Sequence, residues 1–196
     1  MAHPKEEKTV VLIKPDGVKR GLTGEVIKRI ESRGLKIIAL KMIVASSEHV
    51  HRHYPQTEEW LRGMGEKTLD NYRQYDKDVI QEIGTDDTLE IGKMVSKWNV
   101  DFLISGPVIA MVVQGIHAID MVRKIVGKTI PAQAEMGTIR GDFSVDSPTL
   151  ANLGKRAIHN IVHASGDPSE AAHELEHWFS PEEIHEYKRA EEDIMF

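Results

Sequence analysis

Two short runs of almost wholly apolar residues constrain the fold of this chain more than any other feature of the sequence. They are Thr9–Lys14 and Pro107–Gln114, and apolar runs of this length are typical of strands buried in the middle of a sheet. Leu35–Val44, which is rich in Ile, Leu and Val, and Ala157–Val162 are similar in character. We therefore predict a sheet of four strands.

Amphipathic helices are predicted between these runs. In Leu22–Arg33 the apolar residues fall on one helical face, and in Ile116–Val126 they follow the same spacing. The resulting order is that of the ferredoxin-like α+β sandwich, in which two helices cover one face of a four-stranded antiparallel sheet. We predict this βαββαβ fold, as a single domain over residues 1–196.

Several segments connect or interrupt these elements. Pro15–Gly17 is predicted to be a turn and Ser47–Tyr54 a short helix. Residues 55–100 are polar and broken by glycines, and we predict a mostly helical insertion that decorates the core. Gly127–Phe143 is long enough to be a binding loop, and residues 144–156 are predicted to form a second, loop-like insertion.

Composition argues against several classes of function. The chain of 196 residues carries a formal net charge of -6, which argues against a protein that binds nucleic acid by neutralising its phosphates. It contains no cysteine, so disulfides and thiol catalysis are excluded. No apolar run approaches the roughly 20 residues that span a membrane, and Met1–Lys8 lacks the apolar segment of a signal peptide. We expect a cytoplasmic protein without a membrane or nucleic-acid partner.

His163 follows the last predicted strand, and a strong helix start follows His163. Asp167 is a capping residue, Pro168 suits the first helical position, and Glu170 completes a capping box. The free backbone N–H groups at such a helix start favour an anion such as phosphate. A histidine beside an anion site indicates phosphoryl chemistry, although a lone histidine is more commonly a partly buried residue that makes one hydrogen bond.

Two short motifs indicate other chemistries. Gly127–Thr129 matches the end of a Walker A loop, but the first glycine of that loop would fall on Val122, so a P-loop is excluded. His173–His177 matches H-E-x-x-H, the helix on which two histidines bind zinc in metalloproteases. Ser180 and Glu183 stand where the extended form of that motif requires Gly and His.

A zinc hydrolase therefore remains an alternative, and it requires a third ligand near the end of the chain. His185 or Glu186 has a suitable position. We favour the interpretation that His173 and His177 are exposed helix residues. The buried stripe of their helix then consists of Ala171, Leu175 and Trp178.

Four segments resemble the signature segments of nucleoside diphosphate kinases, in the same order. They are Lys14–Glu25, Ser105–Pro107, Gly137–Phe143 and Asn160–Ser165. The resemblance implies a ferredoxin-like fold and ping-pong transfer of a γ-phosphate from a nucleoside triphosphate to a nucleoside diphosphate through a phosphohistidine. It also implies a homo-oligomer, with a hexamer as the expected state.

The resemblance implies roles for individual residues as well. His163 is the nucleophile, and Ser165 and Glu174 support it. The residues that bind the substrate are Lys14, Tyr54, Arg123, Thr129, Arg140 and Asn160. Phosphoryl transfer depends mainly on positioning and on cations at the phosphate oxygens, so the basic groups in this set are chemically sensible. We expect these cations to lower the pKa of His163, and Glu174 to raise it.

Departures from the family pattern leave questions open. The family's Gly-Ser-Asp after the histidine is replaced by Ala164–Asp167, and residues 55–100 are longer than their counterpart. Trp60 is the candidate for stacking on the base, and the base preference stays open. Mg²⁺ is expected to arrive on the nucleotide phosphates, because no carboxylate cage is visible. A nucleotide-binding regulatory protein without turnover is the second alternative.

Overall fold

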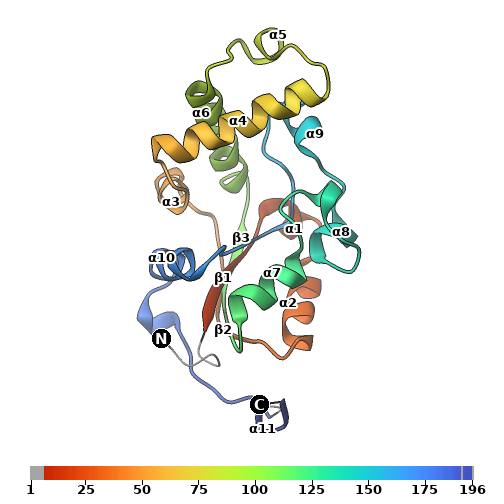
Figure 1. The fold of residues 1–196 in the computed structure, drawn as a ribbon. Helices are drawn as coiled ribbons and strands as arrows, with labels where there is room; N and C mark the ends of the chain where they lie inside the picture. The colour runs from red at the N-terminus through yellow and green to blue at the C-terminus, as the bar shows by residue number, and fades with distance from the viewer. Residues whose placement is uncertain (1–6, 191, 196) are drawn as a thin grey trace.

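A four-stranded antiparallel sheet forms the centre of the computed structural model, which describes residues 7–190 and 192–195 (Figure 1). The strands are β1 Lys8–Ile13, β2 Lys36–Ile43, β3 Val108–Gln114 and β4 Val162–Ala164. Their order in the sheet is β2-β3-β1-β4, and every neighbouring pair is antiparallel. This arrangement confirms the predicted ferredoxin-like fold. Strand β1 lies between β3 and β4, and Leu12 pairs with His163.

Helices α2 Thr23–Ser32 and α7 Ala118–Val126 cover one face of the sheet (Figure 1). These are the two helices of the βαββαβ repeat, at their predicted positions. Their apolar faces pack on alternate side chains of β1 and β3. The buried members of this layer include Val11, Ile13, Val26, Ile30, Met111, Val113, Val122 and Val126.

The opposite face of the sheet is also covered. Helices α3 Ser47–His53, α6 Thr88–Leu103 and α10 Pro168–Trp178 supply its apolar layer. The prediction placed helices on one face only, but β1 and β3 are apolar at consecutive positions, so both of their faces must be removed from water. The buried members include Val10, Leu12, Val50, Val100, Leu103, Val112 and Trp178.

Residues 58–103 form three helices that rise from the sheet. They are α4 Glu58–Gln74, α5 Val79–Ile83 and α6, and α4 packs directly across α6 (Figure 1). Two glycines allow this close crossing. A methyl group at Gly65 would lie 1.9 Å from the carbonyl oxygen of Thr88, and one at Gly92 would lie 1.9 Å from that of Leu61.

The observed secondary structure differs from the prediction at two places, both close to His163. The predicted turn at Pro15–Gly17 is the start of a short helix, α1 Pro15–Lys19, with proline at its first position. The last strand was predicted at Ala157–Val162, and that prediction was wrong, because β4 begins only at Val162. Ile161 has a φ of 70°, which no extended strand can accommodate.

Short helices break up the long loop before β4. They are the 3₁₀ turn η2 Pro131–Gln133, α8 Ile139–Phe143 and α9 Pro148–Leu153. The chain continues after α10 through the 3₁₀ turn η3 Pro181–Glu183 to α11 Glu192–Met195. Among the residues that the structure describes, no helix combines the length and apolar character of a membrane span.

Candidate active site

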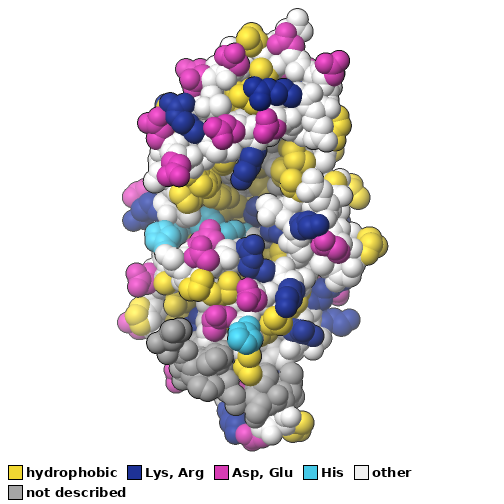
Figure 2. Space-filling view, in the orientation of Figure 1, with side chains coloured by type: hydrophobic (Ala, Val, Ile, Leu, Met, Phe, Trp, Pro, Cys, Tyr) yellow, Lys and Arg dark blue, Asp and Glu magenta, His cyan; other side chains and the backbone are white. Residues whose placement is uncertain are grey.

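A cleft of about 1610 Å³ separates helices α4 and α6 from α7 and the loop that follows it. Figure 2 shows the hollow, with apolar side chains on its walls and basic side chains near it. Seven of the predicted site residues line this cleft: Lys14, Tyr54, Arg123, Thr129, Arg140, Asn160 and His163. Ser165 and Glu174 lie behind His163, away from the open space.

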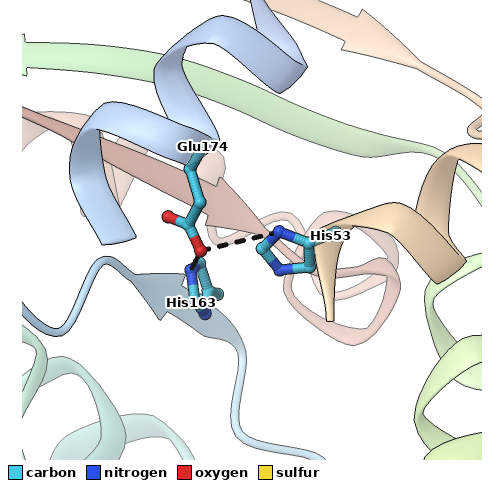
Figure 3. Close-up of side chains that lie close together, drawn as sticks. All are labelled: His53, His163 and Glu174. Atoms are coloured by element: carbon cyan, nitrogen blue, oxygen red, sulfur yellow. Dashed lines mark hydrogen bonds and ion pairs between the residues drawn. The ribbon is translucent and has the colours of Figure 1, made fainter. Parts of the chain in front are cut away.

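His163 is fixed by a chain of contacts that leads back to strand β1, and Figure 3 shows the first of them, to Glu174. Its Nε2 lies 2.7 Å from Oε1 of Glu174, which is buried on α10. The hydroxyl of Ser165 donates to Oε2 of Glu174 at 2.7 Å and accepts from the backbone N–H of Val10 at 3.1 Å. An ionised carboxylate only accepts hydrogen bonds, so Nε2 carries the proton of the neutral ring and Nδ1 keeps a lone pair.

The imidazole of His163 is neutral at physiological pH. Burial lowers its pKa, and the charges of Lys14, Arg140 and Arg123 lower it further, against the opposing charge of Glu170. The effect of the cations agrees with the expectation from the sequence, but the charge that raises the pKa of His163 is that of Glu170 and not that of Glu174, which was expected. Burial also raises the pKa of Glu174. The ring is still 19% exposed, so a ligand in the cleft can reach it.

His53 is a member of this cluster that the sequence analysis missed (Figure 3). It lies on α3, fully buried, with Nδ1 3.5 Å from Oε1 of Glu174 and its ring edge-on to that of His163. The indole N–H of Trp178 donates to Nδ1 at 3.2 Å, and burial keeps the pKa of His53 well below its usual value. Its signal in the sequence is a position one turn after the apolar Val50, on the buried stripe of the helix.

Lys14 occupies the N-cap position of α1, and its side chain contacts the loop before β4. Its ammonium group donates to Oδ1 of Asn160 at 2.8 Å, and the amide of Asn160 donates to the carbonyl of Thr129 at 2.9 Å. Burial and the charge of Arg140 lower the pKa of Lys14 from 10.5 to about 8, whereas Asp16 raises it. Lys14 is therefore mostly protonated at pH 7.

Arg140 is a buried cation held by backbone carbonyls. It donates to the carbonyls of Gly127 at 2.8 Å, Asn160 at 3.3 Å and Val162 at 2.7 Å, and burial lowers its pKa to about 10. Its guanidinium retains further N–H groups that a ligand can use. The neighbouring Asp142 pairs with Arg29 instead of Arg140.

Arg123 and Thr129 extend the polar side of the cleft. Both are exposed, and Arg123 lies in the last turn of α7. Within residues 7–190 and 192–195, neither the guanidinium of Arg123 nor the hydroxyl of Thr129 makes a hydrogen bond or ion pair. These groups are available to a ligand in the cleft.

Aromatic and apolar side chains form the opposite wall. The rings of Tyr54 and Trp60 are stacked, with centroids 6.2 Å apart, and Met64 and Trp98 continue the wall along α4 and α6. Burial, and then the charge of Glu174, raises the pKa of the Tyr54 hydroxyl, so this group stays protonated. The inserted helices thus line the cleft, a position that the sequence analysis did not predict.

The H-E-x-x-H helix does not form a zinc site. Nε2 of His173 and of His177 face the backbone carbonyls of Arg52 and His49, at 3.3 and 2.8 Å, so these nitrogens carry protons rather than a metal. His173 is exposed as predicted, but His177 is half-buried and its ring stacks on His49. The glutamate of the motif points to His163.

The start of α10 differs in detail from the predicted capping box. Asp167 caps the helix and accepts from the N–H of Glu170 at 2.9 Å, as predicted. The carboxylate of Glu170 accepts from the N–H of Gly166 rather than from that of Asp167. Gly166 and Glu170 both line the cleft, so the helix start borders it.

One group of potential metal ligands occurs among the described residues: His53, His163 and Glu174, whose ligand atoms lie within 4.8 Å of one another. Two imidazoles suit transition metals better than Mg²⁺, which prefers oxygen ligands. The residues of the cleft thus provide no cage suited to Mg²⁺.

A neutral imidazole surrounded by fixed cations is suited to attack on a phosphoryl group, whose oxygens the cations can bind. The fold and the site thus define a phosphotransferase. The family model of nucleoside diphosphate kinase matches residues 7–61 and 90–184. The chain belongs to the nucleoside diphosphate kinase family.

Known proteins of this family are similar to the chain over nearly its whole length. The nucleoside diphosphate kinase of Pyrobaculum aerophilum is 50% identical over 178 residues, which are 91% of this chain and 97% of that one. The crystal structure of an NDP kinase from that organism has a TM-score of 0.90 at 48% identity, covering 92% of this chain and 100% of that chain.

A more distant relative has been solved with ligands. It is a transition state mimic of the nucleoside diphosphate kinase from Borrelia burgdorferi, with bound vanadate and ADP. Its TM-score is 0.77 at 33% identity, covering 97% of this chain and 96% of that chain.

Proposed function

We propose that this protein transfers the γ-phosphate of a nucleoside triphosphate to a nucleoside diphosphate, through a phosphohistidine at His163. The observation that carries the proposal is the contact of 2.7 Å between Nε2 of His163 and Glu174, which leaves Nδ1 with a lone pair. The charges of Lys14 and Arg140 act on the same imidazole. The family membership supports it, as does the Borrelia relative with bound vanadate and ADP.

The reaction consists of two balanced displacements at phosphorus. Nδ1 of His163 attacks the γ-phosphorus, a bond forms between nitrogen and phosphorus, and the bond to the bridging oxygen breaks with its electrons on the departing diphosphate. An oxygen of the second diphosphate then attacks the phosphohistidine, and the nitrogen–phosphorus bond breaks with its electrons on Nδ1. The proton on Nε2 stays directed at Glu174, whose charge stabilises the positive ring that develops.

The remaining site residues bind and orient the nucleotide. Lys14, Arg123 and Arg140 place positive charge around His163, and we infer that they bind the phosphate oxygens. Asn160 and Thr129 lie beside Lys14 and are suited to the sugar and the phosphates. Tyr54 and Trp60 form an aromatic wall on which a base can stack. Stacking tolerates any base, so we expect broad nucleotide specificity.

Mg²⁺ is proposed to enter as part of the nucleotide complex. This ion keeps several waters and is commonly held by substrate phosphates, which agrees with the absence of an oxygen cage among the described residues of the cleft. Bound in this way, it would neutralise part of the phosphate charge.

A homo-oligomer is supported by the edge of the sheet. Strand β2 is an edge strand. The C-terminal segment contacts the backbone of Ile37 and Ile38, and Glu183 pairs with Lys41 at 2.7 Å. On either side of Lys41, the apolar side chains of Leu40, Met42 and Val44 are still 50%, 60% and 72% exposed. An apolar edge of this kind is a typical site of subunit pairing. We propose a homo-oligomer, with the hexamer expected from the family resemblance, which light scattering can measure.

The domain organisation is proposed from the same resemblance, and the location is proposed from the composition of the sequence. We infer one nucleoside diphosphate kinase domain that carries the helical insertion and the shorter insertion at 144–156, in a cytoplasmic protein. The segment that the family model leaves unmatched, residues 62–89, supports an insertion shorter than the predicted 55–100.

The proposal is tested by incubating the protein with Mg²⁺ and γ-labelled ATP without an acceptor, and then adding GDP. We expect acid-labile, alkali-stable label on the protein, which GDP converts to labelled GTP. His163→Ala should take no label, whereas His51→Ala, which changes an exposed histidine of α3, should behave as wild type. Tight ATP binding without label would instead indicate a nucleotide-binding protein without turnover.

A further inference from the structure

Ile161 adopts a backbone conformation that a β-branched residue rarely adopts. Its φ is 70°, and the N–H of Val162 donates back to the carbonyl of Asn160 at 2.7 Å, which closes a tight γ-turn. Strained turns of this kind persist only where surrounding groups hold them. The strain lies two residues before His163.

The segment that follows β1 holds both polar groups of this turn. Oδ2 of Asp16 accepts from the N–H of Ile161 at 2.9 Å, and the N–H of Lys14 donates to the carbonyl of Ile161 at 2.8 Å. Gly17 leaves room for the approach, since a methyl group there would lie 3.0 Å from that carbonyl oxygen. The side chain of Asp16 is therefore the acceptor that satisfies the strained N–H.

The turn at Ile161 arranges three groups of the site at once. It directs the side chain of Asn160 to the ammonium group of Lys14. It also turns the carbonyls of Asn160 and Val162 to Arg140, which donates to both. His163 follows Ile161 by two residues, so its position depends on the same turn.

We propose that Asp16 is a positioning residue of the phosphoryl-transfer site, which acts by holding Ile161 in its strained turn. The proposal rests on the function proposed above. Asp16 touches none of the reacting atoms, and its effect passes through the backbone of Ile161 to Asn160, Arg140 and His163.

The charge of Asp16 has a second, separable effect. Asp16 raises the pKa of Lys14, whereas burial and Arg140 lower it, so Asp16 favours the protonated lysine. The other titratable groups that interact with Lys14 are His53, His159 and His163. The second oxygen of Asp16, Oδ1, is buried and makes no hydrogen bond within the described chain.

Two substitutions separate the acceptor from the charge. Asp16→Asn keeps an oxygen for the N–H of Ile161 and removes the charge, whereas Asp16→Ala removes both. In Asp16→Ala we expect amide hydrogen exchange at Ile161 to be about tenfold faster or more, and kcat/KM for labelling of His163 to fall about 10²-fold. In Asp16→Asn we expect hydrogen exchange at Ile161 and labelling of His163 at pH 6.5 to stay close to those of the wild type. The alkaline limb of the pH profile, where labelling falls as Lys14 loses its proton, should move to lower pH.

A matched control is Asp78→Ala, which removes another aspartate that accepts from backbone N–H groups, at the start of α5 and outside the cleft. It should leave labelling unchanged. The proposal would be overturned if Asp16→Ala were labelled at the wild-type rate and if hydrogen exchange at Ile161 in this variant were as slow as in the wild type. If Asp16→Ala does not fold, Asp16→Glu replaces it, because this variant keeps the charge but displaces the carboxylate. We expect it to be labelled slowly, with the alkaline limb of its pH profile unchanged. Labelling of Asp16→Glu at the wild-type rate would overturn the proposal.

The failure of the proposed function gives a different result. It would appear as wild-type protein that takes no label at all. Hydrogen exchange at Ile161 does not depend on turnover, so it would still report whether Asp16 holds the turn.

Discussion

Nε2 of His163 lies 2.7 Å from the carboxylate of Glu174, and this contact distinguishes the two ring nitrogens. The bonded nitrogen holds the proton and keeps the ring in one orientation, while Nδ1 is left with its lone pair. A second contact, from Ser165 to Glu174, fixes the carboxylate itself. The two nitrogens of one side chain thus have different chemical roles.

The phosphate is therefore expected on Nδ1 of His163. NMR of the isolated phosphoenzyme distinguishes the two isomers, because the ring nitrogens couple differently to phosphorus. Phosphorylation at Nε2 would contradict the arrangement, since it would require the ring to leave Glu174.

Removing the carboxylate should slow the formation of the phosphoenzyme. We expect Glu174→Ala to raise the barrier by about 2–4 kcal/mol, the scale of losing one stabilising group. Glu174→Gln keeps an acceptor for Nε2 and should be less affected. Single-turnover labelling measures both variants, and a wild-type rate in Glu174→Ala would refute the role of this residue.

Lys14 should set an alkaline limit to the activity. Its pKa is about 8, and only the protonated form attracts the phosphates, so kcat/KM should be constant below this pH and fall as the pH rises through it. Lys14→Gln should have a lower kcat/KM, and its kcat/KM should not fall further as the pH rises through about 8. A profile of the wild type that stays flat up to pH 9.5 would show that Lys14 has no such effect.

Replacement by lysine should have different effects at the two arginines of the cleft. Arg140→Lys cannot reproduce the bonds to three buried carbonyls, and each group left unsatisfied costs about 1–3 kcal/mol. We expect both stability and labelling to fall. Arg123→Lys keeps an exposed charge, so thermal unfolding should be unchanged while the KM for nucleotide rises. Equal losses of stability in the two variants would contradict this distinction.

The close crossing of α4 and α6 provides a test of the aromatic wall. Gly65→Ala forces a methyl group against the backbone of Thr88 and should destabilise the protein by about 1–3 kcal/mol. Gly63→Ala, on the same helix with open space around it, should stabilise by up to about 1 kcal/mol. Denaturant unfolding compares them. We also expect a higher nucleotide KM in Gly65→Ala only, because Trp60 and Met64 would move.

Local patterns in the sequence predicted much of the fold. The apolar runs of β1 and β3 and the cap at Asp167 are encoded by neighbouring residues, so they can be recognised without tertiary structure. The start of β4 could not be recognised, because the conformation of Ile161 depends on Asp16, a residue 145 positions away. Nothing local marks such a contact.

The candidate site was predictable only in part. Resemblance to a family identified seven residues that line one cleft and two more, Ser165 and Glu174, that lie behind His163, whereas hydrophobic spacing alone did not. His53 was missed because a buried histidine on a helix has the same spacing as an apolar residue. The role of α4 and α6 as a wall was missed because their polar composition is typical of a solvated segment, and only their packing shows which face lines the cleft.

The helices that cross at α4 and α6 and the sheet that carries His163 are separate parts of the protein, so their sequences can vary separately. Residues 62–89, which the family model leaves unmatched, approach the nucleotide cleft but lie outside the sheet that carries His163. If the proposed function is correct, mutations there would change the surface around the base without altering the contact between His163 and Glu174. Changes in this segment would then alter the choice of substrate separately from the proposed chemistry at His163.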